Sequence, residues 1–259
     1  LAMAARQPAQ AEGKEGGAKG ETMTETAVRM MGFSSWVDWA VEPAERAGCP
    51  PGKLLPDPPA LPPGVVQRTL VLSLEDCIIH TEWDRKHGHR TKKRPGLEAF
   101  LAHVSQFYEV VIFTTAMSSY GQPIAMSLQD TGYVQHALFR ESCKYTGGKF
   151  VKDLSYLNRD LRHVIIIDNN PDSYANDPHN AVHIREWSGD TDDTQLLELI
   201  PFLEAIFRED IPDVRDVLAH MPSSRVPETF RELRHQQLER RKRGGALLGR
   251  ARAPAGVVP

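Results

Sequence analysis

The chain has 259 residues, of which 41% are hydrophobic and 25% charged, a balance typical of a globular domain and not of a disordered or fibrous protein. Its 34 acidic and 31 basic side chains leave a net charge of −3, so overall charge does not indicate a nucleic-acid-binding protein. No apolar run approaches the roughly 18 residues of a membrane span, which excludes an integral membrane protein within this sequence.

The ends of the chain differ from its middle. Residues 1–26 are rich in Ala, Gly, Glu and Lys with almost no large apolar groups, so we predict a tail that is disordered unless a partner binds it. Residues 27–64 are predicted to form an amphipathic helix carrying Trp36 and Trp39, followed by a stiff proline-rich strap. The sequence begins with Leu1 and has no secretory signal, so we expect a trimmed or processed N-terminus.

A domain is predicted over residues 65–222. Continuous apolar runs indicate four buried strands, at 69–74, 109–115, 163–170 and 180–185. Helices are expected after them, over about 95–104, 121–130, 191–207 and 212–220. Two hairpins are expected, one turning at His87–Gly88 and one inserted around Gly147–Gly148. Strands that alternate with helices predict the α/β class, with a doubly wound parallel sheet.

Residues 223–259 form a basic tail. From Arg225 onward nine Lys and Arg side chains face three Glu, a net charge of +6. The stretch 231–243 is compatible with a solvated helix in an otherwise uncommitted tail. The alternative is that the tail docks on an acidic protein surface, on anionic lipid or on RNA.

The cysteines do not suggest a site. Cys49, Cys77 and Cys143 are odd in number and widely spaced, so we expect isolated thiols and neither a disulfide framework nor a metal centre.

Polar residues follow the predicted strands where ligands bind in parallel α/β sheets, at the carboxyl ends of the strands. The candidates are Ser73 to His80, Thr114, Lys152, Asp168 and Asn169. One polar residue at a strand end is usually a cap or a turn, whereas several at the same edge predict a binding or catalytic pocket.

Longer motifs share this arrangement. RPG at 94–96, VVIFTTAMSSYGQP at 110–123, VKDLSYLNRDL at 151–161 and VIIIDNNPDSY at 164–174 resemble the haloacid dehalogenase superfamily. Within it they resemble the phosphatases of the RNA polymerase II C-terminal domain, over roughly residues 69–220. The resemblance implies a doubly wound sheet of haloacid-dehalogenase type with an inserted β-hairpin, here flanked by extended tails.

The resemblance also predicts what is missing. Active members carry DLDETLVH, in which the first Asp is the nucleophile and a Mg²⁺ ligand and the second is the general acid. Here these positions are Ser73 and Glu75, and strand alternation should point Asp76 to the other face. A serine hydroxyl is neutral and needs an activating base, and the motif offers none.

We therefore predict a pseudophosphatase that uses no cofactor. Thr114, Lys152, Asp168 and Asn169 remain at positions that contact phosphate or metal in active relatives, so Asp168 and Asn169 are where weak Mg²⁺ binding would persist.

One branch of the superfamily is degraded in this way. LLPDP at 54–58, LVLSLEDCIIHTEW at 70–83, KKRPG at 92–96 and LNRD at 157–160 resemble the receptor family of the mitochondrial inner-membrane presequence translocase. The resemblance implies association with the inner membrane, a role in protein import, and presequence peptides and translocase subunits as partners. That family has a membrane helix before the domain, which this sequence does not show.

A presequence is amphipathic and basic, so its receptor needs an apolar groove edged by carboxylates. The candidates are Phe139, Arg140, Tyr145 and Phe150 around the inserted hairpin, with Trp187, Asp192 and Asp193. Alternatively, the acidic run only caps the helix that begins near Thr194. Arg140, Lys144 and Lys149 of the hairpin would repel a basic peptide.

Two other functions fit the sequence. A domain with wrapping tails is typical of a structural accessory subunit of a large mitochondrial assembly, such as a respiratory complex or a mitoribosome. An active Mg²⁺-dependent protein phosphatase is the third possibility, and Ser73 argues against it.

Overall fold

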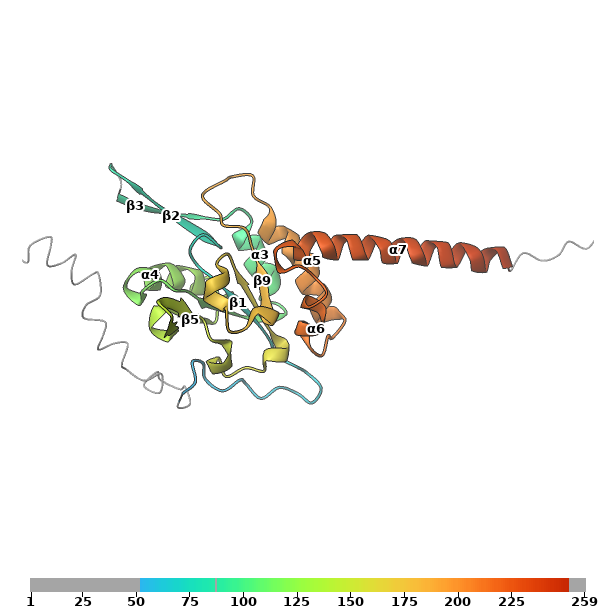
Figure 1. Cartoon of the computed structure of the whole chain (residues 1–259), viewed down its shortest axis with the longest axis horizontal. Coiled ribbons are helices and arrows are strands. Elements are labelled where there is room, and N and C mark those ends of the chain that lie inside the picture. The colour runs from blue at the N-terminus through green and yellow to red at the C-terminus, as the bar shows by residue number, and fades with distance from the viewer. Residues whose placement is uncertain (1–51, 87, 252–259) are drawn as a thin grey trace, which may run out of the picture. The chain divides into compact units, whose positions relative to one another are not determined.

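Five parallel strands form the central sheet of this computed structural model, which describes residues 52–86 and 88–251 (Figure 1). Their order is β5–β4–β1–β8–β9. Their bounds are Arg68–Leu72 for β1, Tyr108–Phe113 for β4, His136–Leu138 for β5, Val164–Asp168 for β8 and Ala181–His183 for β9. The order reverses direction at β1, so the sheet is doubly wound as predicted.

All four predicted strands are present, and each ends two residues earlier than expected. β5 was missed because it has only three residues, two of them half-buried, and no continuous apolar run. The expected tail 1–26, the helix with Trp36 and Trp39, and Cys49 lie outside the described residues.

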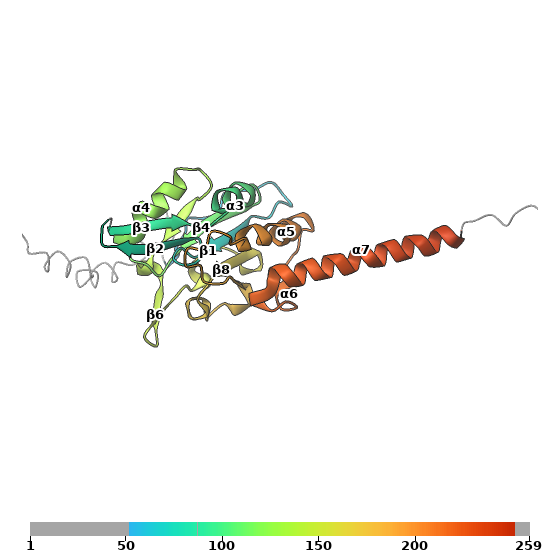
Figure 2. The ribbon, with the colours of Figure 1, turned by 90° about the horizontal axis from the view of Figure 1, so that it is seen from above.

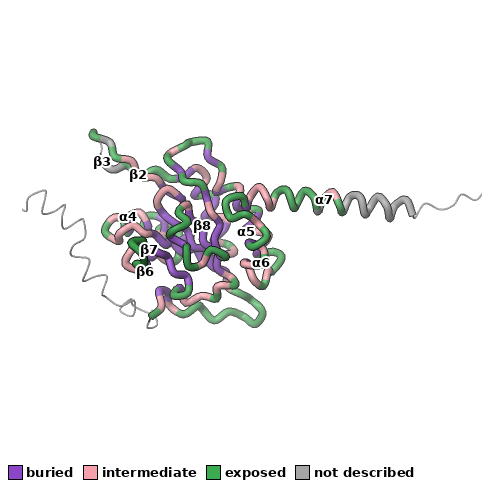
Figure 3. The backbone as a smooth tube through the Cα atoms, viewed as in Figure 1, coloured by how far each residue is buried: buried purple, intermediate pink, exposed green. Residues whose placement is uncertain are grey.

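Alternate residues of the central strands face two different cores. Leu70 and Leu72 of β1 pack with the helices of one face, whereas Val71 packs on the other face. The first face is covered by α3 (Leu97–Val104) and α5 (Gln195–Arg208), with Leu128 of α4 (Ser118–Gln129) at its margin. This layer and the buried strands beneath it are visible in Figures 2 and 3.

Within residues 52–86 and 88–251, no long helix covers the other face. It is covered by 3₁₀ turns such as η3 (Leu154–Tyr156) and by the proline-rich strap, whose Leu54 and Leu55 are buried. Arg159 holds the strap by donating to the carbonyl of Pro56, at 2.8 Å. The core therefore includes residues well before residue 65, where we expected the domain to begin.

Both predicted hairpins are present. β2 (Ile79–Asp84) pairs with β3 (Gly88–Lys93), and β6 (Lys144–Thr146) pairs with β7 (Lys149–Val151). Gly147 and Gly148 have φ of 60° and 81°, which is the left-handed pair that a two-residue turn between twisted strands requires.

Some helix boundaries differ from the prediction. α5 begins at Gln195 and not near 191, because the acidic run before it forms a loop. α4 begins three residues early, since Glu141 accepts hydrogen bonds from the backbone N–H and hydroxyl of Ser118. α6 is limited to Val214–Leu218.

The last helix, α7 (Val226–Ala251), begins inside the core. Val226 is fully buried, and the ring of Phe230 lies 5.7 Å from that of Phe202. A helix over 231–243 is confirmed, but the domain does not end at residue 222 as we expected. Among the described residues, no helix combines the length and apolarity needed to cross a membrane.

Candidate functional site

Three of the predicted site residues contact one another at the carboxyl ends of the strands. The Lys152 ammonium donates to the Ser73 hydroxyl at 2.8 Å and to the Asp168 carboxylate at 2.5 Å. Asp168 ends β8, Ser73 follows β1, and Lys152 follows β7. Ser73 is 6% exposed, and Lys152 and Asp168 are each 1% exposed, so this cluster is almost dry.

Asp168 has a second and a third donor. The hydroxyl of Ser173 donates to the same oxygen, Oδ2, at 2.5 Å, and the backbone N–H of Asn170 donates to Oδ1 at 2.9 Å. The sequence reasoning missed Ser173, whose only signal was its place in the motif 164–174. Both oxygens of the carboxylate are thus already hydrogen-bonded within the chain.

The fold family implies a Mg²⁺ ion here, but the side chains of this cluster do not suit Mg²⁺ as ligands. Mg²⁺ requires near-octahedral oxygen coordination at about 2.1 Å, usually with carboxylates. Asp168 is the only carboxylate of this cluster, its oxygens are engaged, and a cation already lies beside it. Within the described part of the chain, no group of three or more His, Cys, Asp and Glu side chains is placed to hold a metal ion.

Glu75, at the position of the general acid, belongs to a separate network. Its carboxylate accepts hydrogen bonds from the hydroxyls of Tyr120 on α4 and Thr81 on β2. Thr81 also contacts Tyr120 at 2.6 Å and Thr91 of β3 at 3.0 Å. Burial raises the pKa of Glu75, and burial together with the Glu75 hydrogen bond raises the pKa of Tyr120 to about 12.

Asp76 points elsewhere, but not for the reason we expected. β1 ends at Leu72, so strand alternation does not operate at residues 73–76. Asp76 instead has φ of 55°, and its carboxylate lies 2.6 Å from Nδ1 of His80. Its carboxylate is thus engaged with His80.

Thr114 follows β4 and Asn169 follows β8, the strands on either side of β1, and neither has a hydrogen bond to the cluster of Ser73, Lys152 and Asp168. Thr114 is buried, and its hydroxyl oxygen accepts the backbone N–H of Ala116 at 3.0 Å, which stabilises the turn into α4. Asn169 is half-buried next to Asp168.

The residues around the inserted hairpin form an aromatic group. The rings of Tyr145 and Phe150 lie 5.0 Å apart, and the Arg140 guanidinium lies 4.9 Å from the Phe150 centroid. Tyr145 is 54% exposed. Phe139 is half-buried and packs against α4, where a side chain at Gly121 would meet its ring at 3.0 Å.

Two residues expected on the same surface are interior. Trp187 is 3% exposed, and its indole N–H donates to the carbonyl of Asp190. Asp193 is 4% exposed and receives two hydrogen bonds of 2.8 Å from the buried guanidinium of Arg94. Of the three, Asp192 is exposed.

Asp193 has the structural role that we considered as the alternative. It accepts the backbone N–H of Gln195 at the start of α5, at 3.1 Å. Burial alone would raise its pKa, and the hydrogen bonds from Arg94 lower the pKa below its usual value.

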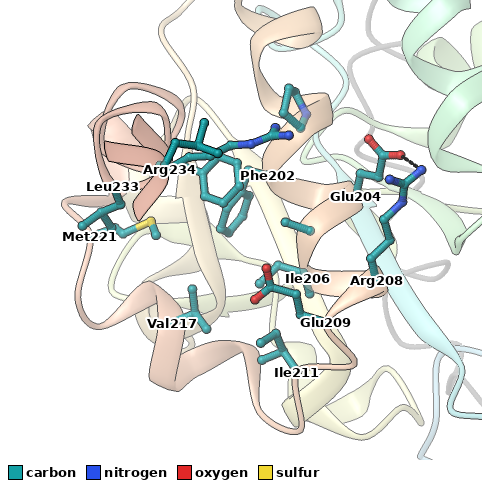
Figure 4. Close-up of a pocket in the computed structure, with 14 residues that line it drawn as sticks. Phe202, Glu204, Ile206, Arg208, Glu209, Ile211, Val217, Met221, Leu233 and Arg234 are labelled. Atoms are coloured by element: carbon teal, nitrogen blue, oxygen red, sulfur yellow. Dashed lines mark ion pairs between the residues drawn. The ribbon is translucent and has the colours of Figure 1, made fainter. Parts of the chain in front are cut away.

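A groove away from the strand ends has a volume of about 410 Å³ and lies between α5, α6 and α7 (Figure 4). Apolar side chains such as Phe202, Ile206 and Leu233 line it together with charged ones such as Glu209 and Arg234. At its rim Glu204 and Arg208 form an ion pair of 2.6 Å. None of the predicted site residues lines it.

Comparison with known proteins gives a consistent result. Residues 68–215 match the family described as NLI interacting factor-like phosphatase. The mitochondrial import inner membrane translocase subunit tim50 of Neurospora crassa is 43% identical over 213 residues, covering 80% of this chain and 39% of that protein. TIM50 of Debaryomyces hansenii is 46% identical over 183 residues, covering 69% and 38%. The chain thus spans about two fifths of the length of these relatives.

A solved structure of Fcp1, an essential RNA polymerase II CTD phosphatase, is similar over 55% of this chain and 50% of that chain, with 21% identity and a TM-score of 0.42. The family match includes β1, β4 and β8 and the polar strand ends that follow them, and it covers more than half of the 259 residues. The chain therefore belongs to the NLI interacting factor-like phosphatase family.

Proposed function

We propose that this chain is a non-catalytic phosphatase-like domain of a mitochondrial protein-import receptor, associated with the inner membrane, that binds presequences and translocase partners. The import role is supported by relatives named as inner-membrane translocase subunits at 43% and 46% identity. The observation that carries the non-catalytic part is the contact between Ser73 and Lys152. The group at the nucleophile position is a hydroxyl held by an ammonium donor, and such a donor does not remove its proton.

The proposal has a direct enzymatic test. The purified chain should hydrolyse an aryl phosphate in the presence of Mg²⁺ no faster than a blank. Turnover that is abolished by Asp168→Asn would contradict the non-catalytic role and favour an active phosphatase. Ser173→Ala is the control. It removes one hydrogen bond to Asp168 and leaves the carboxylate in place, so it shows whether a disturbed environment of Asp168 is enough to abolish activity.

For presequences, the best-supported surface is the aromatic group at the inserted hairpin. Its basic residues do not repel a basic peptide as strongly as their number suggests, because carboxylates compensate them. Lys149 lies 2.7 Å from Asp172, and Lys144 lies 3.7 Å from Asp153. The exposed ring of Tyr145 then offers the apolar contact that an amphipathic helix requires.

Binding is tested with a fluorescent basic amphipathic peptide and its charge-matched, non-amphipathic scramble. Tyr145→Ala should weaken binding of the amphipathic peptide about tenfold, the scale of an aromatic anchor in an interface. Leu233→Ala, which removes a 41% exposed apolar side chain from the groove beside α7, is the matched control and should leave binding unchanged. Equal binding of peptide and scramble, or equal effects of the two variants, would contradict recognition at the hairpin.

A further inference from the structure

The strand-end cluster contains a cation of its own. We propose that the Lys152 ammonium is the resident cation of this pocket, in the role that Mg²⁺ has in the fold family, so that the pocket is complete without a metal and does not recruit one.

The first argument is that hydrogen bonds already occupy most of Asp168. A carboxylate offers about four lone-pair directions, and three donors occupy this one: Lys152 and Ser173 on Oδ2 and the backbone N–H of Asn170 on Oδ1. An ion that entered at Oδ2 would have to displace Lys152 or Ser173, and the displaced group would then be left buried with a lost hydrogen bond, so a single direction on Oδ1 is left for an ion. The neutral hydroxyl of Ser73 is a poor replacement for the second carboxylate that a hard cation prefers.

The second argument is charge. Lys152 and Asp168 are each 1% exposed, and their charges cancel. Adding Mg²⁺ would leave an excess of two positive charges in a site that water does not reach, which is strongly unfavourable. The nearest other carboxylate of the former active site, Glu75, is committed to Tyr120 and Thr81.

The third argument is that the ion pair has a structural task. Lys152 comes directly after β7, and its backbone N–H donates to the carbonyl of Ser173 at 2.7 Å, while the hydroxyl of Ser173 donates to Asp168. Lys152, Asp168 and Ser173 therefore fasten the base of the β6–β7 hairpin to the end of β8. A lysine can fasten the hairpin because its side chain supplies the positive charge while its backbone follows directly from the hairpin itself, whereas a free metal ion is not attached to the hairpin.

The proposal is tested on the full chain by isothermal titration with Mg²⁺ alone and by the thermal unfolding midpoint, Tm, with Mg²⁺ or EDTA. The wild type should show no binding heat at millimolar Mg²⁺ and no shift of Tm with either addition. Ser73→Asp supplies a second carboxylate and makes the pocket net negative, so Mg²⁺ should raise the Tm of this variant. Binding to the wild type that Asp168→Asn abolishes would overturn the proposal, as would a Ser73→Asp variant whose Tm does not respond to Mg²⁺.

The role of Lys152 as counter-cation is tested by a double-mutant cycle, which does not depend on metal. Lys152→Met should lower Tm clearly, and Asp168→Asn in the same chain should restore part of that loss, because it removes the uncompensated charge. Lys149→Met, on the same hairpin but exposed and paired with Asp172, is the matched control and should change Tm little. If the double variant loses as much as the two single variants together, Lys152 does not balance Asp168 and the proposal fails.

Discussion

The hydroxyl of Tyr120 donates a hydrogen bond to the carboxylate of Glu75. Glu75 is thereby tied to α4, and through Thr81 to the β2–β3 hairpin. The Glu75 carboxylate thus links two structural elements, so substitutions around it should report on stability and hairpin order.

Tyr120→Phe should destabilise the domain by about 1 kcal/mol, because it removes one hydrogen-bond partner from each of Glu75 and Thr81 while the ring is kept. Equilibrium unfolding in urea measures the loss, and hydrogen exchange should show faster exchange in β2 and β3. Tyr145→Phe removes a hydroxyl from an exposed ring and is the control, with no expected change. Equal effects of the two variants would show that the hydroxyl of Tyr120 does not contribute to stability.

Glu109 provides a pH-dependent test at the opposite end of the sheet. Burial alone would raise its pKa, but hydrogen bonds from Arg159, at 2.7 Å to each oxygen, and from His136 and Thr69 lower the pKa to about 2. The ionised form is therefore favoured by folding. Its stabilisation is fully present above the usual value of 4.5 and is lost as the pH falls from there towards 2.

Glu109→Gln should therefore be less stable than the wild type by on the order of 2 kcal/mol at pH 7. This gap, the difference between the two free energies of unfolding, should narrow as the pH falls from 4.5 to 3, and urea unfolding at several pH values measures it. Glu98→Gln, at an exposed carboxylate paired with Lys93, should show only a small gap. A Glu109→Gln gap that is constant with pH would mean that the ion pair with Arg159 does not carry the stabilisation.

The strap can be tested by truncating its leucines. Leu55 is 1% exposed in the second core, so Leu55→Ala should cost about 2–5 kcal/mol through lost burial and a residual cavity. Leu61 of the same strap is 41% exposed, and Leu61→Ala should fall within about 0.5 kcal/mol of the wild type. If the two variants are equally stable, the strap does not belong to the folded domain.

Arg94 is a buried charge with several hydrogen-bond partners. Besides Asp193, it donates to the carbonyls of Cys77 and Arg185. Arg94→Leu should cost about 3–5 kcal/mol, because it leaves the buried Asp193 with only the longer ion pair to Arg185, at 3.3 Å. Lys93→Leu, its neighbour, removes only a solvent-exposed pair with Glu98 and should cost at most about 1 kcal/mol. Thermal unfolding of both variants, compared side by side, decides whether burial makes the difference.

The sequence by itself determined the α/β class, four of the five sheet strands and both hairpins. It could do so because β1, β4 and β8 are buried on both faces, which makes them continuous apolar runs, and because Gly147 and Gly148 favour a tight turn. It also showed that Ser73, and not a carboxylate, follows the first strand, since that is a matter of residue identity alone. The short strand β5 and the ends of the helices were not determined, because contacts such as Glu141 with Ser118 fix them.

Only the tertiary structure decided how the site residues are used. Whether Asp193 and Trp187 face solvent depends on Arg94 and Asp190, which approach them across a loop, and no periodicity in the sequence encodes this burial. Likewise, a lysine and an aspartate at Lys152 and Asp168 would by residue type alone be compatible with a phosphate site or a metal site. Their short contact arises because the fold packs three strand ends together. The result is a buried ion pair whose other hydrogen-bond partners are Ser73 and Ser173.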